Sequence, residues 1–444
     1  MRMLVKSILL IVILIFTASS SYAESVRLYG SLKGMNTTKS KIVQTGISSE
    51  VFNDKIIEIE GDAEGNFNVT ANISEPGYYS LGRNVIYIKP GDVIELYPSS
   101  SAANTVFKGS GSEFNDYLKG CGWQEGRQVI NIGEQRTFTQ IVHVADSIGK
   151  LRQRDLDRLT ITDKNVYDTE IARINAEKIS LYFNYFIYSL QIQKGDSDSS
   201  KASKKHNYYK SIEGVVTPLM QNITASGDYL EVPVVRSIIF ESLDYGYFKI
   251  EKSAALTELI ATKKYSTKVD LGITKENFKE LSDYANIIKN NMLKSSYKNK
   301  LEARSKFMEG TPASDFEIKD ITGKSHKLSE HKGEVLFIDF WATWCMPCLG
   351  QSPYFKVLSE KYTTIRFLSI SVDQDPEKWK KKIGAETEKT IANYIADVYQ
   401  LQKSWDLQTI PRFILIDKEF NIITAFAPRP SDKQAIEALL DKYK

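Results

Sequence analysis

The spacing of hydrophobic residues changes twice along the chain, and each change indicates a different type of structure. Between residues 24 and 112, short runs of alternating apolar and polar residues are separated by Gly, Pro and Asn. One example is the turn Pro90-Gly91-Asp92, which is followed by the alternating run Val93–Tyr97. Short alternating segments with this punctuation predict a β-sandwich.

From residue 113 to residue 305 the apolar residues recur at steps of mostly three and four. Such spacing predicts amphipathic helices. The clearest set is Ile171, Ile174, Ile179, Tyr182, Phe183 and Phe186. Two further stretches, Ser237–Phe248 and Phe278–Leu293, follow the same rule, and the polar segment Gly195–Ser200 is expected to be a loop between helices.

Residues 306–444 alternate between strand-like and helix-like segments. A strand Glu334–Phe340 is followed by a helix Leu349–Lys361 and a second strand Ile365–Asp373. A hairpin over 412–426 and a final helix over 432–443 complete the series. This order predicts an α/β sheet with helices on both faces. The chain is therefore expected to be multidomain, with a β-sandwich over 24–112, a helical region over 113–305 and an α/β domain over 306–444.

The first 23 residues have the pattern of a secretory signal peptide. Arg2 and Lys6 precede the apolar run Ser7–Phe16, and Ser21-Tyr22-Ala23 forms a small-residue cleavage site. The protein is therefore expected to be exported to the bacterial periplasm or cell envelope. An uncleaved signal would tether it to the membrane. Loss of Arg2 and Lys6 would lower the 58 basic residues to 56, against 55 acidic ones, and this near-neutral balance argues against a nucleic-acid partner.

Three cysteines are present, and two of them, Cys345 and Cys348, are three positions apart. A disulfide-stapled scaffold would need more cysteines. A structural zinc site needs about four ligands, and only Cys121 and four histidines remain to complete one, so no metal is expected. The pair is instead expected to be redox-active. Cys121 could be a buried thiol, a surface thiol or an intermolecular partner, and burial is the commonest state of a free Cys.

The local sequence explains how such a pair could react. A strand is expected to end at Phe340 and a helix to begin at or just after Cys345. The Cys345 thiol would then face the positive end of the helix dipole, which stabilises the nucleophilic thiolate. Cys348 would lie one turn later and resolve a mixed disulfide, and Pro347 suits the first helical turn because it lacks an N–H group.

The segment Phe340-Trp341-Ala342-Thr343-Trp344-Cys345-Met346-Pro347-Cys348 resembles the thioredoxin superfamily, and within it the TlpA/ResA-like envelope disulfide reductases. The stretch Gly310–Ala313 and the loop Asp320–Lys324 support the likeness, which covers about residues 309–444. The resemblance implies a thioredoxin-like fold over 306–444 whose only redox group is the Cys345–Cys348 disulfide, without a separate cofactor. The first segment more loosely resembles a β-domain of unknown function that precedes such modules.

The same resemblance implies roles for particular residues. Ile410-Pro411 matches the cis-proline that lies opposite the cysteine pair and holds an extended substrate strand. Trp344, Met346 and Pro347 would contact the substrate, whereas Trp341 is expected in the core. Asp339 matches a buried acid that exchanges a proton with the second cysteine. Many relatives instead carry a Glu at the position of Gln351, which cannot exchange a proton, so proton transfer is assigned to Asp339.

These features predict an envelope thiol–disulfide oxidoreductase that reduces disulfides in exported proteins or peptides. The absence of His between the cysteines favours a reductase or isomerase over a strong oxidant. An upstream electron donor, such as a membrane thiol carrier, would recycle the pair. A thioredoxin-fold peroxidase is the alternative, although Ala342 occupies the position where peroxidases need Thr or Ser. Residues 24–305 contain no catalytic cluster, which leaves open a substrate-binding or scaffold protein.

Overall fold

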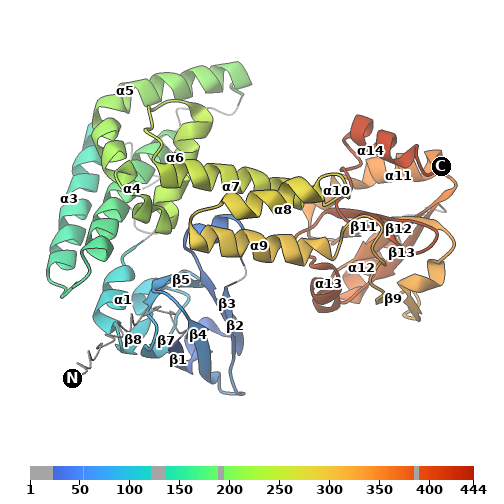
Figure 1. Ribbon diagram of the computed structural model, residues 1–444, viewed down its shortest axis with the longest axis horizontal. Coiled ribbons are helices and arrows are strands. Elements are labelled where there is room, and N and C mark those ends of the chain that lie inside the picture. The colour runs from blue at the N-terminus through green and yellow to red at the C-terminus, as the bar shows by residue number, and fades with distance from the viewer. Residues whose placement is uncertain (1–23, 54, 122–136, 189–194, 385–389) are drawn as a thin grey trace, which may run out of the picture. The chain divides into compact units, whose positions relative to one another are not determined.

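The computed structural model describes residues 24–53, 55–121, 137–188, 195–384 and 390–444, so the expected signal peptide lies outside the described residues. The chain divides into two compact units (Figure 1). The described residues within 24–46 and 55–251 form one unit, and those within 47–53 and 252–444 form the other. This division passes through the region expected to be helical, and the three domain boundaries inferred from the sequence stay predictions.

The described part of the first unit begins with two four-stranded sheets, whose orders are β4-β1-β7-β8 and β3-β2-β5-β6. The strands are β1 (Glu24–Ser31), β2 (Lys39–Gln44), β3 (Ile56–Glu60), β4 (Asn66–Ile73), β5 (Gly77–Leu81), β6 (Asn84–Ile88), β7 (Val93–Tyr97) and β8 (Val106–Gly109). Alternate residues of these strands are buried, as in Ile57 and Ile59 of β3. Buried side chains from both sheets, such as Leu28 and Ile86, form one hydrophobic cluster.

Helices follow the sheets in the same unit: α1 (Ser112–Leu118), α3 (Phe138–Asp157), α4 (Lys164–Tyr188), α5 (Asp198–Thr224) and α6 (Pro233–Tyr245). The segment Gly195–Ser200 is only partly a loop, because the Ser197 hydroxyl accepts the N–H of Ser200 and starts α5 at Asp198. Helices and sheets are joined by polar contacts. The Tyr78 hydroxyl donates to Glu170 over 2.6 Å, and Glu170 also pairs with Arg173 in the interior.

The second unit starts with the helices α7 (Ala254–Asp270), α8 (Phe278–Ile287) and α9 (Asn291–Ser305). The stretch Phe278–Leu293, whose spacing is helical, contains the end of one helix and the start of another, because the Asn290 side chain accepts the N–H of Leu293 and caps a new helix. The 3₁₀ helix η2 (Ile47–Glu50), which lies between β2 and β3 in the sequence, also belongs to this unit. The Ser296 hydroxyl of α9 contacts the Ser48 carbonyl over 3.0 Å.

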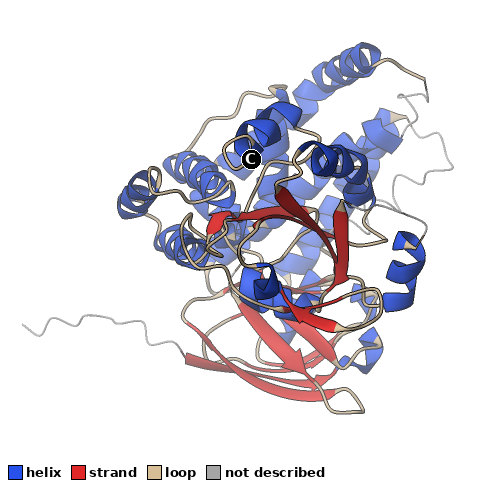
Figure 2. Ribbon diagram, turned by 90° about the vertical axis from the view of Figure 1, so that its right-hand side faces the viewer, coloured by secondary structure: helices blue, strands red, loops and turns tan. Residues whose placement is uncertain are grey.

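The remaining described residues form a seven-stranded sheet with the order β10-β9-β13-β12-β11-β14-β15 (Figure 2). Its strands are β9 (Glu317–Lys319), β10 (Ser325–Lys327), β11 (Val335–Trp341), β12 (Ile365–Ser371), β13 (Ile391–Ile395), β14 (Arg412–Ile416) and β15 (Ile422–Thr424). Its helices are α10 (Met346–Leu349), α11 (Ser352–Lys361), α12 (Pro376–Ile383), α13 (Val398–Trp405) and α14 (Lys433–Leu440). Strand β13 and helix α13 were not predicted from the sequence. The side chains of β13 are mostly half-buried and show no clear alternation.

Helices cover both faces of this sheet (Figure 1). On one face, Phe355 of α11 and Ile436 of α14 pack with Phe337. On the other face, Trp379 of α12 and Leu401 of α13 pack with Ile338. All residues of the central strands β11 and β14 are consequently buried. The multidomain fold with a thioredoxin-like C-terminal domain, a sheet-rich N-terminal region and a helical middle is confirmed.

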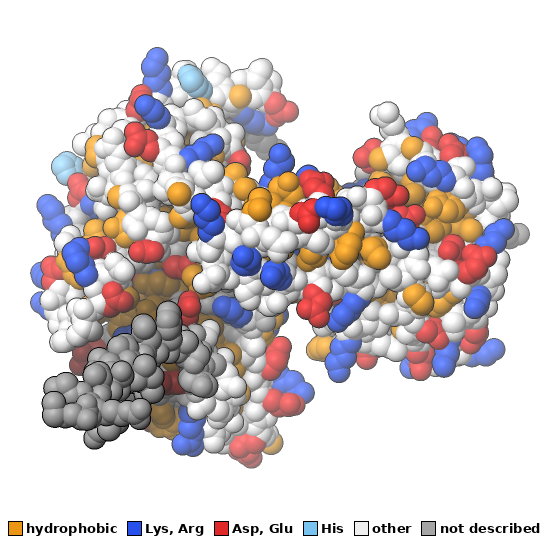
Figure 3. Space-filling model, viewed as in Figure 1, with side chains coloured by type: hydrophobic (Ala, Val, Ile, Leu, Met, Phe, Trp, Pro, Cys, Tyr) orange, Lys and Arg blue, Asp and Glu red, His pale blue; other side chains and the backbone are white. Residues whose placement is uncertain are grey.

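The described surface mixes both signs of charge. On the face drawn in Figure 3, Lys and Arg side chains are interspersed with Asp and Glu. Among the described helices, none combines the length and the apolar composition needed to cross a membrane.

Candidate active site

The cysteine pair lies where β11 passes into α10. Strand β11 ends at Trp341 and α10 begins at Met346, so that Cys345 is the residue that caps the helix. The Cys345 Sγ is bonded to the Cys348 Sγ and accepts the N–H of Cys348 over 3.2 Å. Pro347 occupies the first helical turn, as its missing N–H predicts. The strand-to-helix transition expected around Cys345 is therefore present.

Exposure differs sharply between the cysteines and their neighbours. Cys345 and Cys348 are 5% and 0% exposed, whereas Trp344 and Met346 are 69% and 74% exposed. A partner protein would therefore meet the Trp344 and Met346 side chains around a nearly covered disulfide. Trp341 is 4% exposed and belongs to the hydrophobic core, which confirms the expectation for that residue.

Asp373 holds the loop that precedes Cys345, although the sequence did not single it out. Its carboxylate accepts the Thr343 N–H over 2.9 Å and the Thr343 hydroxyl over 2.7 Å. The Ser371 hydroxyl donates to the same carboxylate over 2.6 Å. Asp373 follows the carboxyl end of β12, the parallel neighbour of β11. A polar residue just after an apolar strand was the available signal, because the carboxyl ends of neighbouring parallel strands lie at one sheet edge.

Asp339 lies in the middle of β11, where it is opposite Ser369 on one side and Phe413 on the other. Strand alternation directs its side chain to the same face as Phe337, which packs against α11. Asp339 is 3% exposed, and within the described residues its Oδ1 has no hydrogen-bond partner. Burial raises the pKa of Asp339 to about 8. Asp339 is therefore a buried acid inside a strand, and its part in proton exchange stays a prediction.

Gln351 has a structural contact. The side chain is 9% exposed, and its Oε1 accepts the N–H of Ser431 over 3.0 Å. Gln351 thus joins the residue that precedes α11 to the segment ahead of α14. Its amide does not ionise, so Gln351 offers no acid–base group at this position.

The peptide bond between Ile410 and Pro411 is cis, as the resemblance implied. Strand β14 starts at the next residue, Arg412, which pairs with Phe340 of β11. Because the two strands are antiparallel, the start of β14 lies beside the end of β11. Ile410 and Pro411 therefore lie at the sheet edge from which the loop to Cys345 leaves.

Two histidines that could bind a metal ion contact other side chains. His326 lies 3.1 Å from both Asp320 and Glu330, and His331 contacts Glu334 and Tyr394. Both histidines are half-buried. Among the described side chains, no group of three or more His, Cys, Asp or Glu is arranged to hold a metal ion.

Cys121 is free and belongs to the first unit. The residue is half-buried, and the Arg152 Nη2 donates to its Sγ over 2.6 Å. Burial raises the pKa of the Cys121 thiol despite the neighbouring Arg173 and Arg152. A thiol with this environment is held in its neutral form, which is unfavourable for nucleophilic attack.

Comparisons with known proteins agree on the C-terminal region. Residues 308–440 match the family model described as Redoxin. The thiol-disulfide oxidoreductase ResA of Geobacillus thermodenitrificans is 29% identical over 138 residues, which cover 29% of this chain and 77% of that protein. The thioredoxin-like protein YneN of Bacillus subtilis is 33% identical over 112 residues, covering 25% of this chain and 55% of that protein.

One solved structure is similar to part of this chain. It is the crystal structure of a Bacteroides vulgatus protein assigned as a thiol-disulfide oxidoreductase, and it is 42% identical to this chain. The match covers 32% of this chain and 99% of that one, with a TM-score of 0.30 over the present chain.

Proposed function

We propose that this chain, a thiol–disulfide oxidoreductase, reduces disulfides of exported proteins through Cys345 and Cys348. Its C-terminal domain belongs to the thioredoxin superfamily and is ResA-like. The observation that carries the proposal is the disulfide at the start of α10, nearly covered itself and flanked by the exposed Trp344 and Met346. Such an arrangement suits a partner that docks on the surface and presents its own disulfide to the pair.

In the proposed cycle, the reduced pair attacks first through the Cys345 thiolate. It forms a bond to one substrate sulfur, while the other substrate sulfur leaves as a thiolate. Cys348 then gives its proton to Asp339 and attacks the Cys345 sulfur. The second substrate thiolate is released and the Cys345–Cys348 disulfide remains, so two electrons have passed to the substrate. A carboxyl whose pKa is about 8 can exchange this proton near neutral pH.

Ile410 and Pro411 are proposed to hold the substrate as an extended strand. The half-buried Ile410 precedes the first residue of β14 and lies at the edge of the sheet that leads to the cysteine loop. Strand addition to exposed backbone groups gives affinity without demanding one substrate sequence. Trp344, Met346 and Pro347 would complete the contact from the opposite side of the disulfide.

The proposed setting is the cell envelope, since residues 1–23 have the pattern of an exported protein. The substrate would be a protein or peptide disulfide, and an upstream donor such as a membrane thiol carrier would reduce Cys345–Cys348 after each cycle. Ala342, which replaces the Thr or Ser of a peroxidase, disfavours the peroxidase alternative.

The assignment of the nucleophile can be tested with three matched variants. Cys345→Ala should lower reduction of insulin by dithiothreitol to the uncatalysed rate. Cys348→Ala should accumulate mixed disulfides, visible by non-reducing electrophoresis. Cys121→Ala is the control and should retain wild-type activity, because its thiol lies in the other unit. Full activity in Cys345→Ala would contradict the assignment.

The direction of transfer needs a separate measurement. Equilibration of the pair with glutathione gives its reduction potential. A value at or below about −230 mV would match thioredoxin-like reductants, whereas a value near about −120 mV would mark an oxidant and reverse the proposed direction.

A further inference from the structure

Asp406 is the residue that caps the carboxyl end of α13, five positions before Pro411. Its backbone is in the left-handed region, with φ 46° and ψ 49°. Residues other than Gly adopt this conformation at a cost, although Asp is among those that tolerate it best. Gly would fit this backbone more easily, so the carboxylate must supply something that Gly lacks. Its contacts identify what that is.

One oxygen of Asp406 reaches forward along its own loop. The Gln408 Nε2 donates to the Asp406 Oδ1 over 2.8 Å, and the N–H of Gln408 donates to the Asp406 carbonyl over 3.0 Å. These two bonds fold the chain between α13 and Ile410 into a tight turn. The conformation of Asp406 therefore fixes the path by which the chain approaches Pro411.

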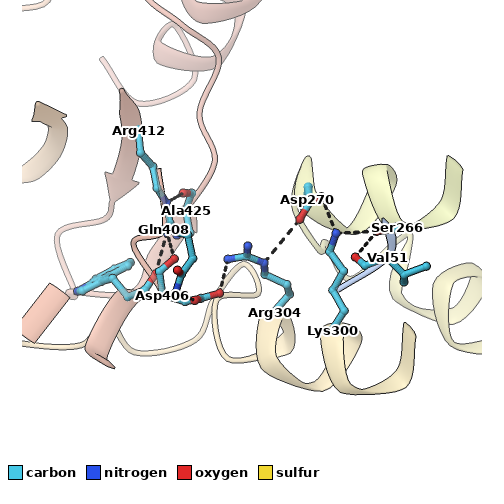
Figure 4. A network of polar contacts seen from close by, with 10 residues as sticks. Val51, Ser266, Asp270, Lys300, Arg304, Asp406, Gln408, Arg412 and Ala425 are labelled. Carbon is cyan, nitrogen blue, oxygen red and sulfur yellow. Dashed lines mark hydrogen bonds and ion pairs between the residues drawn. The ribbon is translucent and has the colours of Figure 1, made fainter. Parts of the chain in front are cut away.

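The other oxygen of Asp406 pairs with an arginine from outside the sheet. The Arg304 Nη1 of helix α9 lies 2.7 Å from the Asp406 Oδ2 (Figure 4). The side chains of Arg304 and Asp406 are 12% and 24% exposed. Water screens such a pair less than it screens a surface ion pair. The contact is a charge pair rather than an aligned hydrogen bond, since among the described residues neither the Arg304 Nη1 nor the Asp406 Oδ2 has a hydrogen-bond partner.

Arg412 holds the same turn from within the sheet. Its guanidinium donates to the carbonyls of Trp405, Asp406 and Ala425 over 2.8–3.0 Å. The guanidinium carbons of Arg412 and Arg304 lie 4.3 and 5.1 Å from the centre of the Phe426 ring. Burial and the charge of Arg304 lower the pKa of Arg412, whereas the Asp406 charge opposes this shift. The negative charge of the Asp406 carboxylate thus offsets the repulsion between two guanidiniums that contact the same aromatic ring.

Arg304 also forms a second ion pair, with a residue of α7. Its Nε lies 3.7 Å from Asp270 of α7, and Asp270 also pairs with Lys300 over 2.6 Å. Lys300 donates to the Ser266 hydroxyl over 2.6 Å, and this hydroxyl donates to the Val51 carbonyl over 2.9 Å (Figure 4). A polar network therefore runs within the second unit from residue 51 through α7 and α9 to the turn before Pro411.

We propose that Arg304 is a positioning residue for disulfide exchange, because its ion pair with Asp406 fixes residues 406–411, where the substrate strand docks. The inference rests on the proposed function of Ile410 and Pro411. It gives the helices α7 to α9 a role in substrate binding although they carry no reacting group. The role should concern only substrates that lie along Ile410 as a strand, since a small disulfide reaches the cysteines without that backbone.

The test uses the full chain and two disulfide probes: insulin is reduced with dithiothreitol as the electron donor, and dithiodipyridine is reduced in a single turnover by pre-reduced protein from which dithiothreitol has been removed. Insulin presents peptide strands, and dithiodipyridine presents none. Arg304→Gln should raise the KM for insulin about tenfold, the change expected for about 1.4 kcal/mol of lost binding. Its kcat for insulin, its rate with dithiodipyridine and its equilibrium constant with glutathione should stay within about twofold of wild type, since only docking is altered.

Matched variants separate positioning from general damage. Lys298→Gln removes the same charge from an exposed position of α9 and should change nothing. Asp406→Asn should raise the KM as Arg304→Gln does, and the double variant should add little, because both changes remove one contact. Gln408→Ala alters only an exposed side chain of the turn and should raise the KM by a smaller factor, which keeps a test available if Arg304→Gln does not fold.

Failure of the inference is distinct from failure of the proposed function. A wild-type chain that reduces neither probe would overturn the proposed function. A wild-type chain active on both probes, with an unchanged insulin KM in Arg304→Gln and in Gln408→Ala, would overturn the positioning role. Equal losses on insulin and dithiodipyridine would also overturn it, since they would indicate damage to the cysteine site.

Discussion

The two sheets of the first unit and the sheet of the C-terminal domain bury their residues in different ways. In β3 of the first unit, alternate residues face the core, so that Glu58 remains exposed between the buried Ile57 and Ile59. In β11 of the C-terminal domain, all seven residues are buried because helices cover both faces. A polar side chain has an exposed face available in β3 and none in β11.

This difference shows in which strands a polar residue is a sign of function. An acid on the exposed face of a strand costs no desolvation free energy, so it indicates only which face of the strand meets solvent. An acid on a strand buried on both faces pays for desolvation, and such a residue is a candidate for function. Asp339 in β11 is of the second kind, and Asp373 just after β12 lies at the edge of the same sheet. The comparison can be tested by replacing acids in each setting.

The largest effect is expected for Asp339→Asn. The native pKa of about 8 lies above the unfolded value of about 3.9, so the native state binds this proton more tightly than the unfolded state does. The stability that this raised pKa contributes is complete below about pH 4 and is lost as the pH rises through 8, by about 6 kcal/mol in all. Asn stays neutral, so the variant should be more stable than wild type at pH 9 by an amount of this order.

Urea unfolding of the oxidised protein between pH 5 and 9, followed by tryptophan fluorescence, would check this. The probe reports on the C-terminal domain because Trp341, Trp344, Trp379 and Trp405 are four of the five tryptophans. Asp339→Asn should also slow release of mixed disulfides by about a hundredfold or more at pH 7, the size of a general-base contribution. Equal pH dependence in variant and wild type would show that Asp339 is solvated.

A smaller effect is expected for Asp373→Ala. This carboxylate accepts three hydrogen bonds, from the Thr343 N–H, the Thr343 hydroxyl and Ser371. Its removal leaves these donors without their partner, which costs about 1–3 kcal/mol. Thermal unfolding would measure the loss. Asp373→Asn should recover part of it, and a stability equal to wild type in Asp373→Ala would mean that the loop before Cys345 is held in another way.

The smallest effect is expected for Glu58→Gln in β3. Glu58 is exposed and opposite Lys41 in the neighbouring strand, so its neutral replacement should change the free energy of unfolding by less than about 0.5 kcal/mol. Activity should be unchanged as well. A loss of stability comparable with that of Asp373→Ala would contradict the contrast between the sheets, since it would show that the fold depends on a solvent-exposed acid.

The sequence predicted those features that depend on neighbours along the chain. Cys345, Pro347 and Cys348 were placed correctly at a helix start because strand, loop and helix follow one another within a few residues. The burial of Asp339 was expected from the resemblance, and the apolar run around it agrees. Helix ends set by a single cap were missed, as at Asn290, because one Asn in a polar stretch is a weak signal.

Contacts between distant segments could not be predicted in the same way. Asp373 reaches Thr343 across 30 positions, and Arg304 reaches Asp406 across about 100, through a fold that brings them together. Nothing near Arg304 in the sequence distinguishes it from the other basic residues of a polar helix. Strand β13 was missed for a related reason, since its pairing with β12 rather than its own pattern makes it a strand.

Residues 47–54 give the molecule an unusual order of assembly. They leave the first unit between β2 and β3 and join α7 and α9, where Val51 and Ser48 bond to partners 215 and 248 positions later. Contacts of such long sequence separation close large loops and slow folding. A chain emerging from its amino end would expose this segment long before its partners exist. The second unit is therefore complete only when its amino-terminal piece has been retained and has found its place, and a carboxyl-terminal fragment starting at residue 252 would lack it.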